Sequence, residues 1–283
     1  MFLPLMHTLG ACVCVRACMY VTYSTCSKSI SCVITRKSGA CACATMSTKP
    51  GADTVNLAGM RIKYKDKSEV FTEDYLVSKE PITQFKAWFE EACNNSQILE
   101  PNAVLIGTAT RDGVPSVRAV LLKSFGTEGF TFYTNYNSRK GREIAENPHV
   151  ALTFYWEPLR RSVRIEGIAE KTSTENSDYY FQSRPYESQI SAAASKQSSV
   201  VASRDSLIAE KNKLLAQFPE GQTKRPDCWG GYLVVPHSIE FWQGQDDRLH
   251  DRIRFRRPKA NEKVDNVLVH EGEDGWVYER LSP

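Results

Sequence analysis

Residues 103–125 read AVLIGTATRDGVPSVRAVLLKSF, and this stretch predicts a β-hairpin. Its two arms, Ala103–Thr110 and Val114–Phe125, are rich in apolar and β-branched residues, and the turn residues Arg111-Asp112-Gly113 separate them. So many short strands in succession predict an antiparallel barrel or sandwich. The further segments of this character are Gly129–Thr134, His149–Trp156, Ser162–Lys171, Gly231–Gln243, Arg248–Arg256 and Trp276–Arg280.

Helical patterns flank these strands. Residues Pro81–Ala92 repeat aromatic side chains at helical spacing after a proline in the first turn, which predicts a helix that packs on the core. Two further helices are expected at about Thr174–Ser183 and Ser203–Phe218. The sequence therefore predicts a mainly β fold with flanking helices.

Composition indicates one globular domain. The chain has 283 residues, 41% of them hydrophobic and 10% aromatic, which is enough for a sizeable core. The formal net charge is +3, but residues 1–52 contain five basic and no acidic residues, which leaves 31 basic against 33 acidic residues in the remainder. Residues 53–283 therefore lack the broad basic surface that nucleic-acid binding needs, and no nucleic-acid partner is expected.

Residues 1–52 differ from the rest of the chain in cysteine content as well. Pairs such as Cys12 and Cys14 have no histidine partner in zinc-finger register, so no metal site is predicted. The basic, Ser/Thr-rich composition fits an organelle transit peptide, whereas the two arginines and the lack of an amphipathic helical period argue against one. The leader holds seven of the nine cysteines: Cys12, Cys14, Cys18, Cys26, Cys32, Cys41 and Cys43.

We expect residues 1–52 to be a disordered and dispensable leader, and residues 53–283 to form the folded domain. No apolar run reaches the ~18 residues of a membrane span, so no membrane partner is expected. The cytoplasm is the expected location, and organelle targeting by the leader is the alternative.

The stretch FWQGQDDRLHDRIRFRR at residues 241–257 combines aromatic, amide and basic side chains. Trp242 and Gln243 would supply ring stacking and amide hydrogen bonds beside guanidinium groups that suit phosphate. A phosphorylated, ring-bearing ligand is one interpretation, and a solvated basic strand that protects a sheet edge is the other. Read as a strand, the stretch places four basic residues on one face: Arg248, His250, Arg252 and Arg254.

A second candidate anion site surrounds Ser138, a good N-cap residue. The helix that it opens would direct free backbone N–H groups, Arg139 and Lys140 toward one point. A capped surface helix with ordinary basic residues is the simpler interpretation. Arg118 and Lys123 favour the anion site, because cations in an otherwise apolar strand need partners. A regular strand would point these two to opposite faces, toward two ligands or two parts of one site.

A third polar group follows the helix expected at residues 174–183. Tyr180 and Arg184 are four positions apart and share a helix face, and Pro185 ends the helix so that Ser188 can turn back toward them. Two hydroxyls and a guanidinium make a phosphate clamp. The loop residues Gln197-Ser198 add a polar pair, and ordinary capping chemistry is the alternative for either element.

Together these segments resemble the pyridoxamine 5′-phosphate oxidase family. The resemblance implies a split β-barrel homodimer that binds FMN at the subunit interface. It also implies oxidation of pyridoxamine and pyridoxine 5′-phosphates by O₂ to pyridoxal 5′-phosphate, with release of H₂O₂. It covers residues 71–283 through RAVLLK (118–123), YTN (133–135), SRKG (138–141), FYWEPL (154–159), SRP (183–185), QSS (197–199), WGGY (229–232), EFWQGQ (240–245), RLHDR (248–252) and YERLSP (278–283).

The resemblance also implies two sets of site residues, and Lys123 belongs to both. His250 need not act as a general base, because nothing in the sequence requires proton abstraction before hydride loss; it and Arg248 would position the substrate. The implied substrate contacts are Lys123, Tyr180, Arg184, Ser188, Arg248 and His250. The implied FMN contacts are Arg118, Ala119, Val120, Leu121, Lys123, Tyr133, Thr134, Arg139, Lys140, Gln197, Ser198, Trp242 and Arg252.

Ser162 departs from the family pattern, because such oxidases commonly place a flavin-contacting glutamine at this point of an Arg-Gln-Val-Arg strand. The shorter serine hydroxyl would reach the flavin through a water molecule or would lose the contact. We therefore expect the departure to affect flavin affinity.

Two rival functions share part of the pattern. An FMN-binding split-barrel reductase acting on another substrate gives no reason for four residues to occur together: Tyr180, Arg184, Ser188 and Arg248. A non-catalytic carrier of pyridoxal phosphate does not need the cations assigned to the flavin.

Overall fold

The computed structural model describes Leu57, Gly59, Met60 and residues 70–283. Contacts divide the chain into two units, Met1–Lys63 and Tyr64–Pro283, and the fold described below is that of the second. The expectation for residues 1–52 lies outside the described residues.

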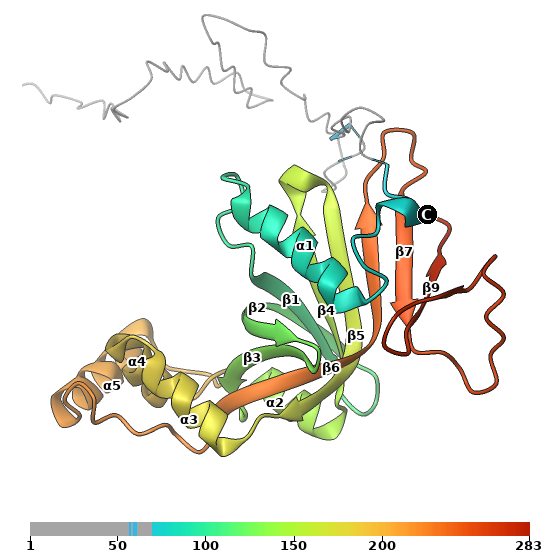
Figure 1. The fold of residues 1–283 in the computed structure, drawn as a ribbon. Helices are drawn as coiled ribbons and strands as arrows, with labels where there is room; N and C mark the ends of the chain where they lie inside the picture. The colour runs from blue at the N-terminus through green and yellow to red at the C-terminus, as the bar shows by residue number, and fades with distance from the viewer. Residues whose placement is uncertain (1–56, 58, 61–69) are drawn as a thin grey trace, which may run out of the picture. The chain divides into compact units, whose positions relative to one another are not determined.

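Six antiparallel strands form a closed barrel (Figure 1). Their order is β3-β2-β1-β4-β5-β6, and β6 pairs back with β3 to close the barrel. The hairpin predicted at residues 103–125 is confirmed as β1 and β2, which pair Leu105 with Ala119. The six strands are β1 (Ala103–Ala109), β2 (Pro115–Gly126), β3 (Gly129–Asn135), β4 (His149–Trp156), β5 (Arg161–Lys171) and β6 (Trp229–Gln243).

Three more strands extend the sheet beyond β6, in the order β7 (Asp251–Arg256), β9 (Val277–Arg280) and β8 (His270–Glu271). The prediction that β7 starts at Arg248 is wrong. Arg248 has a φ of 71°, which an extended strand cannot accommodate, so the residues up to His250 form a loop. The polar stretch from Lys259 to Glu273 contributes the two-residue strand β8.

An aromatic cluster fills the barrel around Phe85 of α1 (Pro81–Asn94). The Phe85 ring is fully buried and lies 5.1 Å from the ring of Phe130 and 5.2 Å from that of Phe154. Alternate strand residues face the same core, as in β4, where the even-numbered positions are buried. Glu80 caps α1 by accepting hydrogen bonds from two backbone N–H groups of the first turn. The packing helix predicted for residues 81–92 is therefore confirmed.

Figure 1 shows α3, α4 and α5 gathered beside β3 and the beginning of β6. The helix α4 was not predicted: Pro185 ends α3 but, with a φ of −52°, also serves as the N-cap of α4. Ser188 therefore lies in the first turn of a helix and not in a reversing turn. No helix in the described part of the chain is both long and apolar enough to cross a membrane. The helices after α1 are α2 (Arg139–Glu146), α3 (Thr174–Ser183), α4 (Tyr186–Ala194) and α5 (Arg204–Gln217), and short 3₁₀ turns occupy Glu73–Tyr75 and Glu157–Leu159.

Candidate active site

A group of cations surrounds the N-terminus of α2, and we call Arg118, Thr134, Arg139, Lys140 and Glu143 the α2 cluster. Ser138 caps the helix as predicted, since its Oγ accepts a hydrogen bond from the Gly141 N–H at 3.2 Å. Arg139 Nε lies 2.8 Å from Glu143 Oε1, and Arg118 Nη2 lies 3.4 Å from Glu143 Oε2. Two of the three cations of the cluster therefore share one carboxylate.

Glu143 is the buried acidic residue of the α2 cluster, and its place in a helix is the one feature of it that the sequence pattern indicates. Burial alone would raise its pKa, but hydrogen bonds from Ser116, Thr108 and Arg139 lower the pKa to about 2. Glu143 is thus ionised at neutral pH, and it orients cations that come from both β2 and α2.

Both hydrogen-bond partners that the structure shows for the Lys140 side chain are neutral. Its Nζ donates to Thr134 Oγ1 at 3.0 Å and to Gln197 Oε1 at 2.9 Å, and the residue is 7% exposed. Burial and the nearby Arg118 lower the pKa of Lys140 to about 8. With one carboxylate for three cations, the α2 cluster carries excess positive charge, and its donors fit a phosphate group such as that of FMN.

A second group lies where α3 meets β3 and β6. The rings of Tyr133 and Tyr180 stack at 3.9 Å, and both are nearly parallel to the indole of Trp229. The guanidinium carbon of Arg184 lies 4.8 Å from the centre of a Trp229 ring. Arg184 Nη1 is buried and is without a hydrogen-bond partner in the described part of the chain, and burial lowers the pKa of this guanidinium. An unpaired buried donor of this kind fits an anionic ligand.

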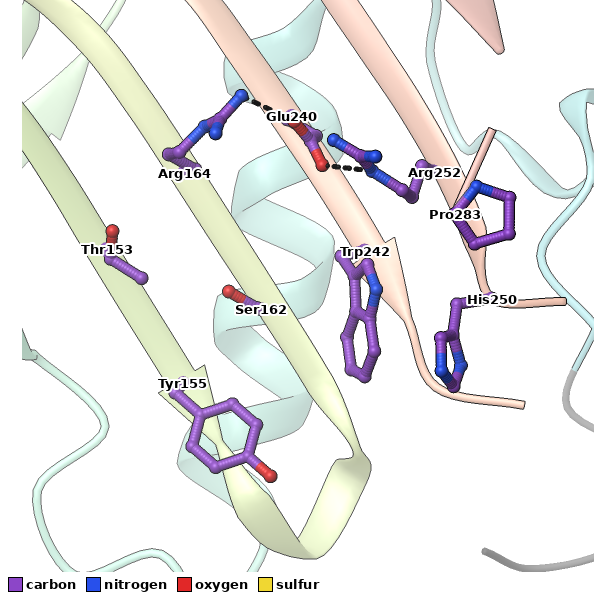
Figure 2. Close-up of a pocket in the computed structure, with 9 residues that line it drawn as sticks. All are labelled: Thr153, Tyr155, Ser162, Arg164, Glu240, Trp242, His250, Arg252 and Pro283. Atoms are coloured by element: carbon purple, nitrogen blue, oxygen red, sulfur yellow. Dashed lines mark hydrogen bonds and ion pairs between the residues drawn. The ribbon is translucent and has the colours of Figure 1, made fainter. Parts of the chain in front are cut away.

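A pocket of about 400 Å³ opens on the outer side of β4 to β7 (Figure 2). The imidazole of His250 lies 4.9 Å from the Trp242 indole. His250 Nδ1 accepts the Gln245 N–H at 2.9 Å, so the neutral ring carries its proton on Nε2. The lining residues are Thr153, Tyr155, Ser162, Arg164, Glu240, Trp242, His250, Arg252 and Pro283.

Glu240 bridges two arginines in this pocket, as Figure 2 shows. Its carboxylate accepts from Arg164 and from Arg252, each at 2.7 Å. Sequence reasoning missed both Glu240 and Arg164, although Glu240 belongs to the quoted EFWQGQ motif. Only the strand register, which pairs Arg164 with Glu240, could have revealed the bridge.

The remaining predicted residues are scattered. Ala119, Leu121 and Lys123 are exposed on β2, whereas Val120 packs against the core. Ser198 and Arg248 both have positive φ and lie in exposed loops. Within the sheet, β1 lies between β2, which carries Arg118, and β4, which carries Thr153 and Tyr155 of the Trp242 pocket. In the described part of the chain, no group of three or more His, Cys, Asp or Glu side chains could hold a metal ion.

Comparison with known proteins identifies the family. Residues 90–215 match the family model described as pyridoxamine 5′-phosphate oxidase, and residues 229–283 match the pyridoxine 5′-phosphate oxidase C-terminal dimerisation region. The chain belongs to the pyridoxamine 5′-phosphate oxidase family. It is 58% identical over 232 residues to the pyridoxine/pyridoxamine 5′-phosphate oxidase of Bombyx mori, covering 81% of this chain and 90% of the relative. Identity to pyridoxine-5′-phosphate oxidase of Bos taurus is 50% over 230 residues, covering 81% and 88%.

Solved structures agree on the fold of this oxidase. PhzG from Burkholderia lata 383, in complex with tetrahydrophenazine-1-carboxylic acid, matches with a TM-score of 0.66 at 30% identity, over 76% of this chain and 98% of PhzG. A pyridoxamine 5′-phosphate oxidase-related, FMN binding protein from Nostoc punctiforme matches with a TM-score of 0.53 at 14% identity, over 70% and 97%. The second likeness bears on the fold alone.

The predicted oxidase family and split-barrel fold are therefore confirmed, and the family is one of oxidoreductases. Membership also supports flavin binding, and the match to the dimerisation region supports the predicted homodimer. The roles of individual site residues stay predictions.

Proposed function

We propose that this chain oxidises pyridoxine and pyridoxamine 5′-phosphates to pyridoxal 5′-phosphate, with FMN as the cofactor and O₂ as the electron acceptor. The observation that carries the proposal is the stack of Tyr133 on Tyr180 at 3.9 Å. Tyr133 adjoins Thr134 of the α2 cluster, and Tyr180 lies one helical turn before Arg184. The contact between β3 and α3 thus brings the strand that carries Thr134 beside the helix that leads to Arg184, which supports an enzyme with a phosphorylated cofactor and a phosphorylated substrate.

The α2 cluster would hold the FMN phosphate. Arg118 and Lys140 would donate charge-assisted hydrogen bonds to it, while Glu143 keeps the cations in place. Trp242 and Arg252 would contact the flavin from their own pocket. Bound FMN would supply the redox chemistry, which is hydride acceptance from C4′ of the substrate and electron transfer to O₂ to give H₂O₂.

Arg184 would bind the substrate phosphate through its unpartnered Nη1, with Lys123, Tyr180 and Ser188 as further donors. Arg248 and His250 would position the pyridine ring. The hydrogen bond from the Gln245 N–H to His250 Nδ1 fixes the orientation of the imidazole. Fixing the substrate in this way lowers the entropy cost of bringing the reacting atoms together.

A homodimer would complete the site. Arg118 of the α2 cluster lies on β2 and the Trp242 pocket begins on β4, with β1 between these two strands. The outward face between them is apolar, since Leu105, Val117, Leu121 and Tyr155 are exposed on β1, β2 and β4. A partner subunit on this face would bury these side chains and bring its own Trp242 pocket to the α2 cluster.

Anaerobic addition of pyridoxine 5′-phosphate to the yellow holoenzyme tests the function. The flavin absorbance should bleach as one equivalent of pyridoxal 5′-phosphate forms, and it should return on admission of air with release of H₂O₂. A protein that stays yellow with pyridoxine 5′-phosphate but bleaches with another reductant would be a reductase acting on a different substrate. A colourless protein that binds pyridoxal 5′-phosphate would be a carrier.

A further inference from the structure

The Trp-Gly-Gly-Tyr motif at residues 229–232 opens β6 and has no role in the function described so far. Trp229 is 7% exposed. In the pairing of β3 with β6, Trp229 lies opposite Asn135, and Gly231 lies opposite Tyr133. The motif therefore packs against the stacked rings of Tyr133 and Tyr180.

Gly231 makes room for Tyr133 of this stack, and Gly230 makes room for the neighbouring ring of Tyr136. A Cβ on Gly231 would lie 2.8 Å from Cε1 of Tyr133, and a Cβ on Gly230 would collide with the hydroxyl of Tyr136. Neither glycine has an unusual φ, so the requirement is space and not backbone conformation. The tyrosine rings can lie against β6 only because both positions lack a side chain.

Trp229 supports Arg184 without neutralising it. The guanidinium lies 4.8 Å from the centre of a Trp229 ring and 6.0 Å from that of Phe181. Neither contact offers an acceptor in the plane of the guanidinium, and in the described part of the chain no carboxylate pairs with Arg184. A carboxylate would compete with an incoming phosphate, whereas an aromatic face fixes the direction of the guanidinium and leaves its N–H groups available.

Trp229 is itself held to α3 by polar contacts. Its carbonyl oxygen accepts from Arg225 Nη1 at 2.7 Å, and Arg225 Nε donates to Asp178 of α3 at 2.7 Å. The Gly231 N–H donates to Ser177 Oγ of the same helix at 3.2 Å. The indole and the helix that leads to Arg184 thus form one unit.

We propose that Trp229 is a positioning residue that sets the preference for phosphorylated over unphosphorylated substrate by holding the Arg184 guanidinium. The inference rests on the proposed oxidase function. It assigns to Trp229 no contact with the substrate and no part in flavin binding.

The test compares Trp229→Leu with wild-type holoenzyme on pyridoxine 5′-phosphate and on unphosphorylated pyridoxine. The ratio of the two kcat/KM values should fall about tenfold, which matches the loss of one partly desolvated cation–π contact. Titration calorimetry of the holoenzyme with pyridoxal 5′-phosphate and with pyridoxal should give the same change in the ratio of Kd values. Bound flavin should stay at the wild-type level.

Trp276→Leu is the matched control. Trp276 is 4% exposed and carries Arg257 over its ring at 4.0 Å, but it lies in the C-terminal extension of the sheet near β9. This variant removes the same kind of buried indole and the same kind of contact. Its phosphate preference should equal that of wild type.

A double-mutant cycle separates positioning from general damage. In an Arg184→Ala background, Trp229→Leu should cause no further loss of phosphate preference, because the proposed effect acts through Arg184. Trp229→Phe keeps a weaker aromatic face and should lower the ratio about two- to threefold, so it tests the idea even if the leucine variant does not fold.

Equal losses for both substrates, an unchanged ratio in both Trp229 variants, or an undiminished effect in the Arg184→Ala background would each overturn the assignment. Wild-type enzyme that fails to oxidise pyridoxine 5′-phosphate would instead overturn the proposed function. The two failures are distinguished by the wild-type measurement.

Discussion

The ring of Tyr133 on β3 lies 3.9 Å from the ring of Tyr180 on α3, with 23° between the two planes. The pair separates two groups of cations that have different environments. Lys140, next to Thr134, has neutral hydrogen-bond partners, and Arg184 rests on Trp229. Substitutions on either side of the tyrosine pair should therefore affect different ligands.

Arg118→Ala should mainly weaken FMN retention, and Arg184→Ala should leave the protein yellow but raise KM for pyridoxine 5′-phosphate. A charge-assisted hydrogen bond contributes roughly 1.5–3 kcal/mol, so we expect about a ten- to hundredfold loss in each case. Bound flavin and steady-state kinetics measure the two effects. Unphosphorylated pyridoxine is the control, since Arg184→Ala should scarcely change its turnover. Loss of flavin from Arg184→Ala would reverse the division of cations between the two ligands.

FMN affinity of the apoprotein should fall as pH rises through about 8, because Lys140 has a pKa of about 8 and loses its charge there. The free energy of unfolding of the apoprotein should change with pH in the opposite direction. A lysine whose folded pKa is lowered from 10.5 binds fewer protons when folded, so apoprotein stability should rise between about pH 8 and 10.5. Fluorescence titration with FMN between pH 7 and 9.5 measures the first effect.

Lys140→Met supplies the control for this pH dependence. The variant lacks the titrating group, so its weaker FMN binding should be nearly flat across the same window. If wild type and Lys140→Met showed equal slopes, another group would be responsible.

Ser162→Gln should tighten FMN binding about three- to tenfold. Ser162 lines the pocket beside Trp242, its cross-strand partner, and a glutamine there would restore the direct hydrogen bond that family members commonly make. A neutral hydrogen bond contributes about 0.5–1.5 kcal/mol. Ser162→Ala should change affinity little if the present hydroxyl reaches the flavin only through water. Weaker binding by the glutamine variant would mean that the side chain blocks the pocket.

A chain that begins at Met46 should purify yellow and active, because it lacks all seven leader cysteines and retains every residue of the proposed site. Flavin content and specific activity beside the full-length protein are the measurements. An insoluble or colourless product from the shorter chain alone would show that the leader is needed for folding.

The sequence predicted the elements whose signal is local. The β1–β2 hairpin followed from apolar arms around Arg111-Asp112-Gly113, and α2 followed from the N-cap residue Ser138. The start of β7 was wrong because the left-handed backbone of Arg248 is set by the loop around it and leaves no mark in the residue pattern. The helix α4 was missed because Pro185 both ends one helix and begins the next.

The missed site residues share a different cause. Glu143 and Glu240 each join cations from separate elements, and Trp229 supports an arginine that lies 45 positions earlier in the chain. Such contacts depend on strand register and helix docking, which single-sequence patterns do not specify. The sequence showed the motifs around these residues, but it did not show which residues of other elements they contact.

The proposed catalytic centre needs residues near both ends of β6, but the length of this strand places its two ends far apart within one subunit. Trp229 is its first residue and Trp242 its next to last. At about 3.3 Å per residue, the strand between the two indoles covers roughly 40 Å, far more than one flavin can reach. Each catalytic centre of the proposed dimer then takes the first end of β6 from one protomer and the second end from its mate. Two variants that are impaired on pyridoxine 5′-phosphate, Arg184→Ala near the first end and Arg252→Ala near the second, should therefore complement each other when the substrate is well below KM. Random pairing leaves one intact centre in half of the dimers, which gives about a quarter of normal activity above the residual activity of the two parents.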